Sequence, residues 1–263
     1  MTAARNSRIP HRRIAETVAA ELRERIFADD QYSFATQEQL VREFGVSHPS
    51  IREALRILET EGLVTVRRGK VGGADVHRPD EAQAAYHIGL SLQSARVTLR
   101  DLAVGLQMLE PNCAEACASR EDRAEVVVPA LRRCVEMSEQ TMNDGVVFTQ
   151  SGRDFHRLIV SFTPNPVIRS AVGSYVALWS AQEQAWAVAT TRKGSYPSSA
   201  LESDVVCAHR RIVDEIEAGR PGEAKRLARA HLEATQAFII EHHGDSVVNV
   251  SSSSSWLGRP SMR

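Results

Sequence analysis

Three histidines in this 263-residue sequence have the type and setting that metal chemistry needs. His156, His209 and His231 each stand among apolar residues at helical spacing, on three different predicted helices. Neutral imidazole is a common ligand of zinc, nickel and similar ions, and helical bundles build metal sites from side chains that face one another in the core. The alternative is three unrelated core histidines, each with its own hydrogen-bond partner.

A second group of residues, in the segment 36–70, combines hydroxyl, imidazole and cationic side chains. Arg52 and Arg56 are four residues apart and therefore share one face of a helix. A guanidinium fork suits guanine, and hydroxyl groups bond to phosphates or base edges. The candidate DNA-binding residues are Thr36, Ser47, His48, Ser50, Arg52, Arg56, Arg67, Arg68, Gly69 and Lys70. The alternative is that the charged members are solvated charges on a small helical domain.

The elements that would position this second group follow from apolar spacing and capping residues. A helix is predicted over 10–28, and the break at 29–35 has room for a short strand. Thr36 can cap a second helix that ends at Gly45, with Gln39 completing a capping box. Ser47 can cap a third helix, whose apolar side is formed by Ile51, Leu55 and Leu58. We expect the start of the third helix, including Ser50, to be exposed.

A strand "LVTV", a basic turn "RRGKVGGA" and a returning strand "DVHRP" follow the third helix. Two helices joined by a tight turn present the second one to the major groove, and a basic hairpin supplies phosphate contacts. The sequence "ATQEQLVREFGVSHPSIREALRILETEGLVTVRRGKVGG" resembles the DNA-binding domain of GntR-family regulators. The resemblance implies a homodimer on a pseudo-palindromic DNA operator, with contacts from Arg52, Arg68 and Gly69. Glu38 and His48 depart from the family pattern, where arginine is common.

After Pro79 the sequence pattern is helical almost throughout. The expected helices span 80–95, 98–118, 120–143, 146–162, 165–192, 199–219 and 221–242. The expected organisation is a winged helix-turn-helix domain over 1–78, an all-helical effector domain over 79–243 and a disordered tail over 244–263 that contains "SSSSS". The fold class is therefore mainly α, with one small β-hairpin.

The helical part resembles the FCD-type effector domain of the FadR-like GntR regulators. The segments "LRDLAVGLQMLEPNCAEACA", "DFHRLIV", "NPVIR" and "AHRRIVDEIEAGRPGEAKRLARAHLE" carry the resemblance. It strengthens the interpretation of the three histidines as ligands of a divalent metal of the zinc or nickel type. One departure weakens it, because Gly152 stands where the family commonly has an aspartate. Asp154 is two residues before His156, about 200° round the helix by the ~100° step per residue, and would point away.

The effector pocket is predicted around Gln107, Glu110, Asp154 and Trp179. Many relatives carry an arginine four residues before the "LEP" glutamate, where this chain has Leu106. Without that arginine and the aspartate, we expect a less polar pocket and an acyl or acyl-CoA type of effector. Trp186, Tyr175 and Met108 are further pocket candidates, with core packing as the alternative for each aromatic or methionine side chain.

Bulk composition limits the function classes further. The net charge is −1, and residues 1–78 hold 13 basic and 11 acidic residues, so a DNA-binding surface has to be local. The N-terminus lacks a signal-peptide core, and no apolar run is long enough for a membrane span, which predicts a cytoplasmic protein without a membrane partner. The four cysteines have no zinc-ribbon spacing and are expected to be free thiols.

Two other functions remain open at this point. A metal-dependent enzyme would need an acid or base beside the histidines, and only Asp154 or Glu110 is near in sequence. The sequence shows no nucleophile elbow and no dinucleotide-binding loop. A constitutive DNA-binding protein with a dimerising helical domain is the other possibility. The sequence favours a transcription regulator over an enzyme. In this regulator one domain binds DNA and the other binds a metabolite.

Overall fold

The computed structural model describes residues 11–67, 74–79, 81–197 and 199–250. The chain divides into two units, Met1–Asp80 and Glu81–Arg263. Each unit has its own hydrophobic core. The division lies two residues after the boundary that the change in composition at Pro79 suggested.

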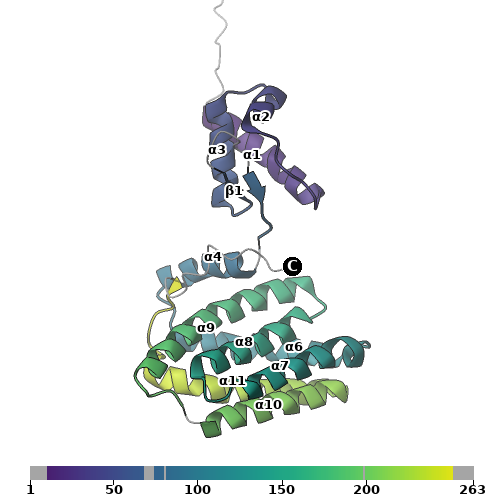
Figure 1. Cartoon of the computed structure of the whole chain (residues 1–263), viewed down its shortest axis with the longest axis vertical. Coiled ribbons are helices and arrows are strands. Elements are labelled where there is room, and N and C mark those ends of the chain that lie inside the picture. Colours follow the sequence, from purple (N-terminus) through teal and green to yellow (C-terminus); the bar gives the residue numbers. More distant parts are fainter. Residues whose placement is uncertain (1–10, 68–73, 80, 198, 251–263) are drawn as a thin grey trace, which may run out of the picture. The chain divides into compact units, whose positions relative to one another are not determined.

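The first unit is a three-helix domain with a two-stranded hairpin (Figure 1). Its elements are α1 (His11–Ala28), α2 (Gln37–Phe44), α3 (His48–Thr60), β1 (Val64–Val66) and β2 (Ala74–Val76). The strands are antiparallel, with Val64 opposite Val76. Residues 29–35 form a turn and an extended segment without ladder pairing, so the short strand expected there is wrong. Tyr32 and Phe34 from that segment pack edge to face against each other and onto the core, which anchors it without a sheet.

The capping residues fix where α2 and α3 begin. The Thr36 hydroxyl accepts from the Gln39 backbone, and the Gln39 side chain accepts from the Thr36 backbone, as a capping box requires. Gly45 ends α2 with a φ of 63°, a left-handed conformation that glycine adopts without a Cβ clash. Ser47 then caps α3 only two residues later. The tight turn between the two helices thus follows from Gly45 and Ser47.

The second unit is a bundle of helices (Figure 1). Its elements are α4 (Glu81–Ser94), α5 (Leu99–Leu109), α6 (Pro111–Ala118), the π-helical turn η1 (Arg123–Val127), α7 (Val128–Gln140), α8 (Gly145–Ser161), α9 (Pro166–Arg192), α10 (Ser199–Glu217) and α11 (Pro221–His243). Helix α8 packs against both α7 and α9, and α11 packs against α6 and α10. Helix α10 also contacts α8, and α6 contacts both α8 and α11, so the three histidine-bearing helices α8, α10 and α11 share one core.

Two of the expected helices are interrupted. The one expected over 98–118 breaks at Glu110, because Pro111 starts α6 and has no amide hydrogen to continue the bonding of α5. The one expected over 120–143 begins as the π-helical turn η1 and becomes regular only at Val128. Pro129, in the first turn of α7, marks this change.

The expectation of a disordered tail from Gly244 is wrong for residues 244–250. Val248 and Val250 are buried in the core of the second unit. The backbone of Val248 donates to Val97, and the amide side chain of Gln182 donates to the carbonyl of Asn249 at 2.7 Å. Apolar residues at 247, 248 and 250 give this segment a face to bury, which its low-complexity continuation at 251–255 lacks.

The cysteines are free thiols, with Cys113, Cys117 and Cys134 buried and Cys207 exposed. Burial raises the pKa of Cys117 to about 12 and that of Cys113 to about 11. Among the described residues, no helix is both long and apolar enough to cross a membrane.

Candidate DNA-binding surface and metal centre

The exposed face at the start of α3 carries His48, Arg52 and Arg56. The side chain of Arg56 is 77% exposed, and its nearest carboxylate, that of Glu53, is 3.9 Å away. On the opposite side of the helix, Ile51 and Leu58 are completely buried. Helix α3 thus directs imidazole and guanidinium groups to solvent from one face while its other face holds it to the domain.

Ser50 departs from the sequence expectation because it is 1% exposed. Its hydroxyl lies 3.0 Å from that of Ser47, and its backbone donates to the Ser47 hydroxyl. Ser50 is therefore part of the helix cap and not of the exposed surface. Thr36 and Ser47 are exposed, but each also uses its side-chain oxygen as a cap.

The hairpin contributes one described candidate, Arg67. Its guanidinium forms a two-pronged ion pair with Asp75 of β2. The pair raises the pKa of Arg67 and lowers that of Asp75, through the side-chain hydrogen bonds between them. Much of the charge of Arg67 is thus balanced within the hairpin. The other three wing candidates, Arg68, Gly69 and Lys70, lie outside the described residues.

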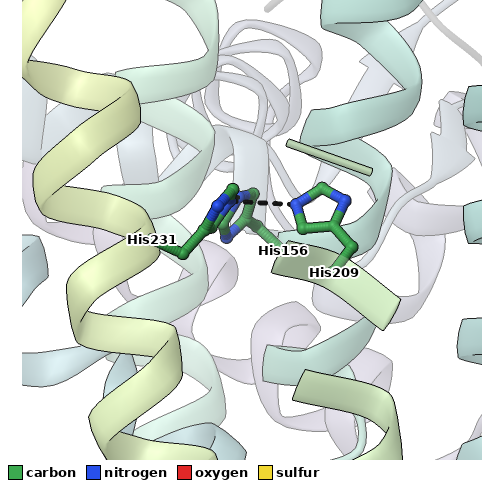
Figure 2. Close-up of side chains that lie close together, drawn as sticks. All are labelled: His156, His209 and His231. Carbon is green, nitrogen blue, oxygen red and sulfur yellow. Dashed lines mark hydrogen bonds between the residues drawn. The ribbon is translucent and has the colours of Figure 1, made fainter. Parts of the chain in front are cut away.

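The three histidines of the second unit converge on one point (Figure 2). His156 comes from α8, His209 from α10 and His231 from α11. Each offers one ring nitrogen to a group whose members all lie within 4.8 Å of one another. The Nε2 atoms of His209 and His231 are 2.9 Å apart, and those of His231 and His156 are 3.3 Å apart.

These nitrogen positions fit a metal ion. Zinc–nitrogen bonds of about 2.0–2.1 Å at a tetrahedral angle place two ligand nitrogens about 3.3 Å apart. A neutral imidazole has one N–H, so the single Nε2 of His231 cannot donate to both neighbours in good geometry. A cation at the centre would instead accept all three lone pairs. The donor set suits zinc or nickel, with an open side for water or a ligand.

The ionisation of the histidines agrees with this role. Burial holds the pKa of His209 and of His231 well below the ordinary value, and the neighbouring imidazoles lower it further. Burial also lowers the pKa of His156, but the charge and hydrogen bond of Glu110 outweigh it and raise the net value. Two of the three rings are therefore neutral at pH 7, the form that binds metal.

Glu110 orients His156 from outside the cluster. Its Oε1 is 2.5 Å from His156 Nδ1, and its side chain is 5% exposed. A carboxylate on Nδ1–H turns the Nε2 lone pair of the same ring toward the centre, as in carboxylate–histidine–metal arrangements. His209 is fixed differently, because its ring stacks on Phe155 with centroids 3.9 Å apart. Its Nδ1 is buried without a hydrogen-bond partner among the described residues.

A cavity opens next to the three histidines, with an empty volume of about 840 Å³ that includes some open solvent. Residues of α5, α8, α9, α10 and α11 line it, together with Tyr196 and Pro197 from the segment before α10. Of the predicted pocket residues, Glu110 and Trp179 lie in its wall. Trp186 also lines it, with its ring against Tyr196 and Phe238.

Four predicted pocket residues lie elsewhere. Gln107 stands behind the wall, where its amide donates to Gln236 at 2.9 Å. Asp154 lies on the α7 side of α8, bonded to Gln150 and paired with Arg157. Placing Asp154 in the pocket was therefore wrong, because its offset from His156 carries it round the helix. Met108 is 66% exposed, and Tyr175 packs against the core.

Among the charged residues of the cavity that were missed in the sequence are Arg153 and Glu183. Arg153 is three residues before His156, so helical spacing alone puts the two on one side of α8. Glu183 stands between Trp179 and Trp186 at spacings of four and three, in the same stripe of α9. Following these stripes through polar positions would have found both. The cavity therefore contains charged groups, which count against the less polar pocket expected from Leu106 and Gly152.

Residues 14–71 match the bacterial regulatory proteins of the gntR family, and residues 101–234 match the FCD domain. The chain belongs to the GntR family and carries an FCD domain. It is a DNA-binding transcription regulator, as the winged helix-turn-helix and effector-type bundle predicted.

Similar full-length proteins agree with this family. The HTH-type transcriptional repressor NanR of Citrobacter rodentium is 26% identical over 243 residues, which covers 89% of this chain and 88% of that protein. NanR of an Enterobacter species is also 26% identical, over 87% of this chain and 86% of its own length. The solved structure of Streptococcus agalactiae GntR superposes with a TM-score of 0.59 at 21% identity, covering 85% of this chain and 99% of that one. The structural match shows a shared fold.

Proposed function

We propose that this GntR-family protein is a repressor, and that a small polar metabolite bound beside a metal in the FCD domain changes its affinity for DNA. The observation that carries the proposal is a charged cavity that opens onto three converging imidazoles, in a chain that also holds a winged helix. The names of the similar NanR proteins support repression. The effector and the operator would then be coupled through the two units of one chain.

His48, Arg52 and Arg56 would read or position the duplex from the start of α3. Their exposure supports this, as does the usual entry of a recognition helix by its N-terminal end. Ser47 and Thr36 would hold the helices through their caps. Arg68, Gly69 and Lys70 would add wing contacts, and Arg67 would contribute least because Asp75 already balances its charge.

The metal would be held by His156, His209 and His231. Bound there, a divalent ion would supply a Lewis-acidic centre for oxygen atoms of the effector. Glu110 would keep the His156 ring turned toward it, and Phe155 would keep the His209 ring in place. The protein would thus present three imidazole nitrogens to the ion on one side and leave the cavity side open.

A compact polar metabolite with an oxygen-rich group suits this cavity better than an acyl chain. The acyl prediction depended on a less polar pocket, whereas Arg153 and Glu183 both line the cavity. Burying such charges against a hydrocarbon chain would be costly without compensating partners.

A homodimer is part of the proposal because two half-sites of a pseudo-palindrome need two recognition helices. The oligomeric state is tested by light scattering of the purified protein at several concentrations. A monomer throughout would argue against a palindromic operator.

The function is tested by DNA selection and anisotropy. Duplexes selected from a random pool should bind the wild type, and Arg52→Ala should bind about 5–150-fold more weakly if a bidentate base contact is lost. Arg226→Ala on α11 is the control, since that arginine pairs with Glu223 on the surface of the second unit. Equal binding by all three proteins would refute the assignment of α3.

The regulatory half is tested on the same duplex with zinc-loaded protein. Hydroxy and keto acids, sugars and acyl compounds would be screened by thermal shift, and stabilising compounds would then be titrated into the DNA complex. At least one polar acid or sugar should change the operator affinity. If no compound does, the chain behaves as a constitutive DNA-binding protein and the sensing role fails.

A further inference from the structure

The cavity contains a carboxylate outside the histidine cluster, that of Glu183. It projects from the middle of α9 into the wall of the cavity next to the histidines. Part of its surface is accessible, and that surface belongs to the cavity. None of the described residues donates a hydrogen bond to it or pairs with it within ion-pair distance.

Such a group is costly to bury unless something compensates it. Burial raises the pKa of Glu183, while the charges of His156 and Arg153 act against that rise. Arg153 does not neutralise it by contact, because its guanidinium is turned to the carbonyl of Ser180 and to Gln150. Its Nε is also buried without a partner among the described residues. The two opposite charges face the same space without touching.

Position 152 on α8 is a glycine in this chain, where the resemblance to FCD domains implies an aspartate. Gly152 is one turn before His156 and lines the same cavity. A Cβ added there would meet nothing within 4 Å, so the space beside the histidines on this side is open. The three imidazoles bring no negative charge to a divalent ion, and the carboxylate of Glu110 is bonded to the Nδ1 side of His156, away from the centre. The open space and the unpartnered carboxylate lie in one cavity with the ligands.

We propose that Glu183 is the acidic partner of the three-histidine centre, acting from α9 in place of a side chain at position 152. This inference rests on the proposed metal site. Glu183 does not belong to the group of ligand atoms within 4.8 Å of one another, so it acts in the outer sphere. Its carboxylate accepts a hydrogen bond from a water molecule on the metal, and it fixes that water on the open side of the cavity. It is a positioning residue, not a ligand.

The test is zinc affinity, measured on the whole chain by competition with a chromophoric chelator. Glu183→Gln should weaken zinc binding about 10–100-fold, the usual range for loss of an outer-shell partner. Glu202→Gln is the matched control, because Glu202 is a buried carboxylate of the same cavity that accepts from the backbone of Asn143. Its zinc affinity should stay within twofold of the wild type. Melting in EDTA verifies that the variants fold equally.

A rescue variant separates a specific role from general damage. Gly152→Asp in the Glu183→Gln background should restore zinc affinity, because the open space at position 152 admits the side chain. The d–d bands of the Co²⁺-loaded Glu183→Gln variant should match those of the wild type, since the three nitrogen ligands are unchanged. A shift of these bands would make Glu183 a direct ligand and overturn the outer-sphere role.

Zinc affinity of Glu183→Gln equal to the wild type would overturn the inference and leave the histidine site standing. An equal loss in Glu202→Gln would also overturn it, because any cavity carboxylate would then have the same effect. Absence of zinc binding by the wild type would instead refute the proposed metal site itself. The two failures are therefore distinguishable in one set of titrations.

Discussion

Replacement of His209 by asparagine gives a direct measure of what the metal contributes to stability. His209 is completely buried, and its Nε2 stands 2.9 Å from that of His231. Asparagine keeps a polar side chain at the position but cannot bring a nitrogen to the same point. Metal-dependent stabilisation should therefore disappear, whatever the substitution does to the metal-free protein.

The expected magnitude follows from linkage. Zinc that binds the folded state alone, at one hundred times its dissociation constant, stabilises that state by about 2.7 kcal/mol. For a unit of 150–250 residues, each kcal/mol raises Tm by about 2–4 °C. The wild type should thus melt about 5–11 °C higher with zinc than in EDTA.

The assay compares the zinc-dependent shift, not Tm itself, between variants. His87→Asn is the control, because His87 is exposed on α4 and is not part of the cluster. It should keep the full shift, whereas His209→Asn should show less than about 1 °C. An unchanged shift in His209→Asn, or no shift in the wild type, would refute the convergence of the three rings on one ion.

Three further predictions concern separate parts of the second unit. Glu110→Gln should lower zinc affinity about 10-fold, measured by chelator competition, because a neutral amide holds the His156 ring less firmly. Gly89→Ala should destabilise the unit by about 1–3 kcal/mol in urea unfolding, because the added Cβ would lie 2.4 Å from the side chain of Val250. A change in the free energy of unfolding no larger than about 0.5 kcal/mol, which is typical of surface substitutions, would contradict the packing of residues 244–250. In native protein at pH 8, a thiol reagent should modify the exposed Cys207 promptly and the three buried thiols only on unfolding, and fast reaction of more than one thiol would contradict their burial.

The DNA-binding unit could be predicted closely because its signals are local. Short sequence signals mark the helix boundaries, namely Thr36 with Gln39, Gly45 and Ser47. The structure has caps at these residues. Ser50 was misjudged for the same reason, since a polar residue at the start of a helix was assumed to be exposed. Its hydroxyl is paired with that of Ser47 within the cap. A buried hydroxyl needs such a partner, but residue spacing alone does not show that the partner exists.

The cavity was harder to predict because its lining comes from helices far apart in the sequence. The three histidines were found by their apolar surroundings, but Glu183 was not, since a glutamate in a helix is usually a surface residue. The contact of Glu110 with His156 depends on the helix break before Pro111. The sequence pattern predicts one continuous helix over 98–118 and so does not predict this contact. The order of residues 244–250 likewise depends on a long-range contact, with Gly89 and α5 at its other end.

The break between α5 and α6 has a mechanical consequence. Glu110 lies between the two helices and is bonded to His156, so a change in the angle between α5 and α6 would shift its carboxylate and, with it, the His156 ring. The side chains of Met108 and Leu109 are exposed at this end of α5, directly before Glu110. A force on this exposed end of α5 would then reach the centre of the bundle as a rotation of the His156 ring.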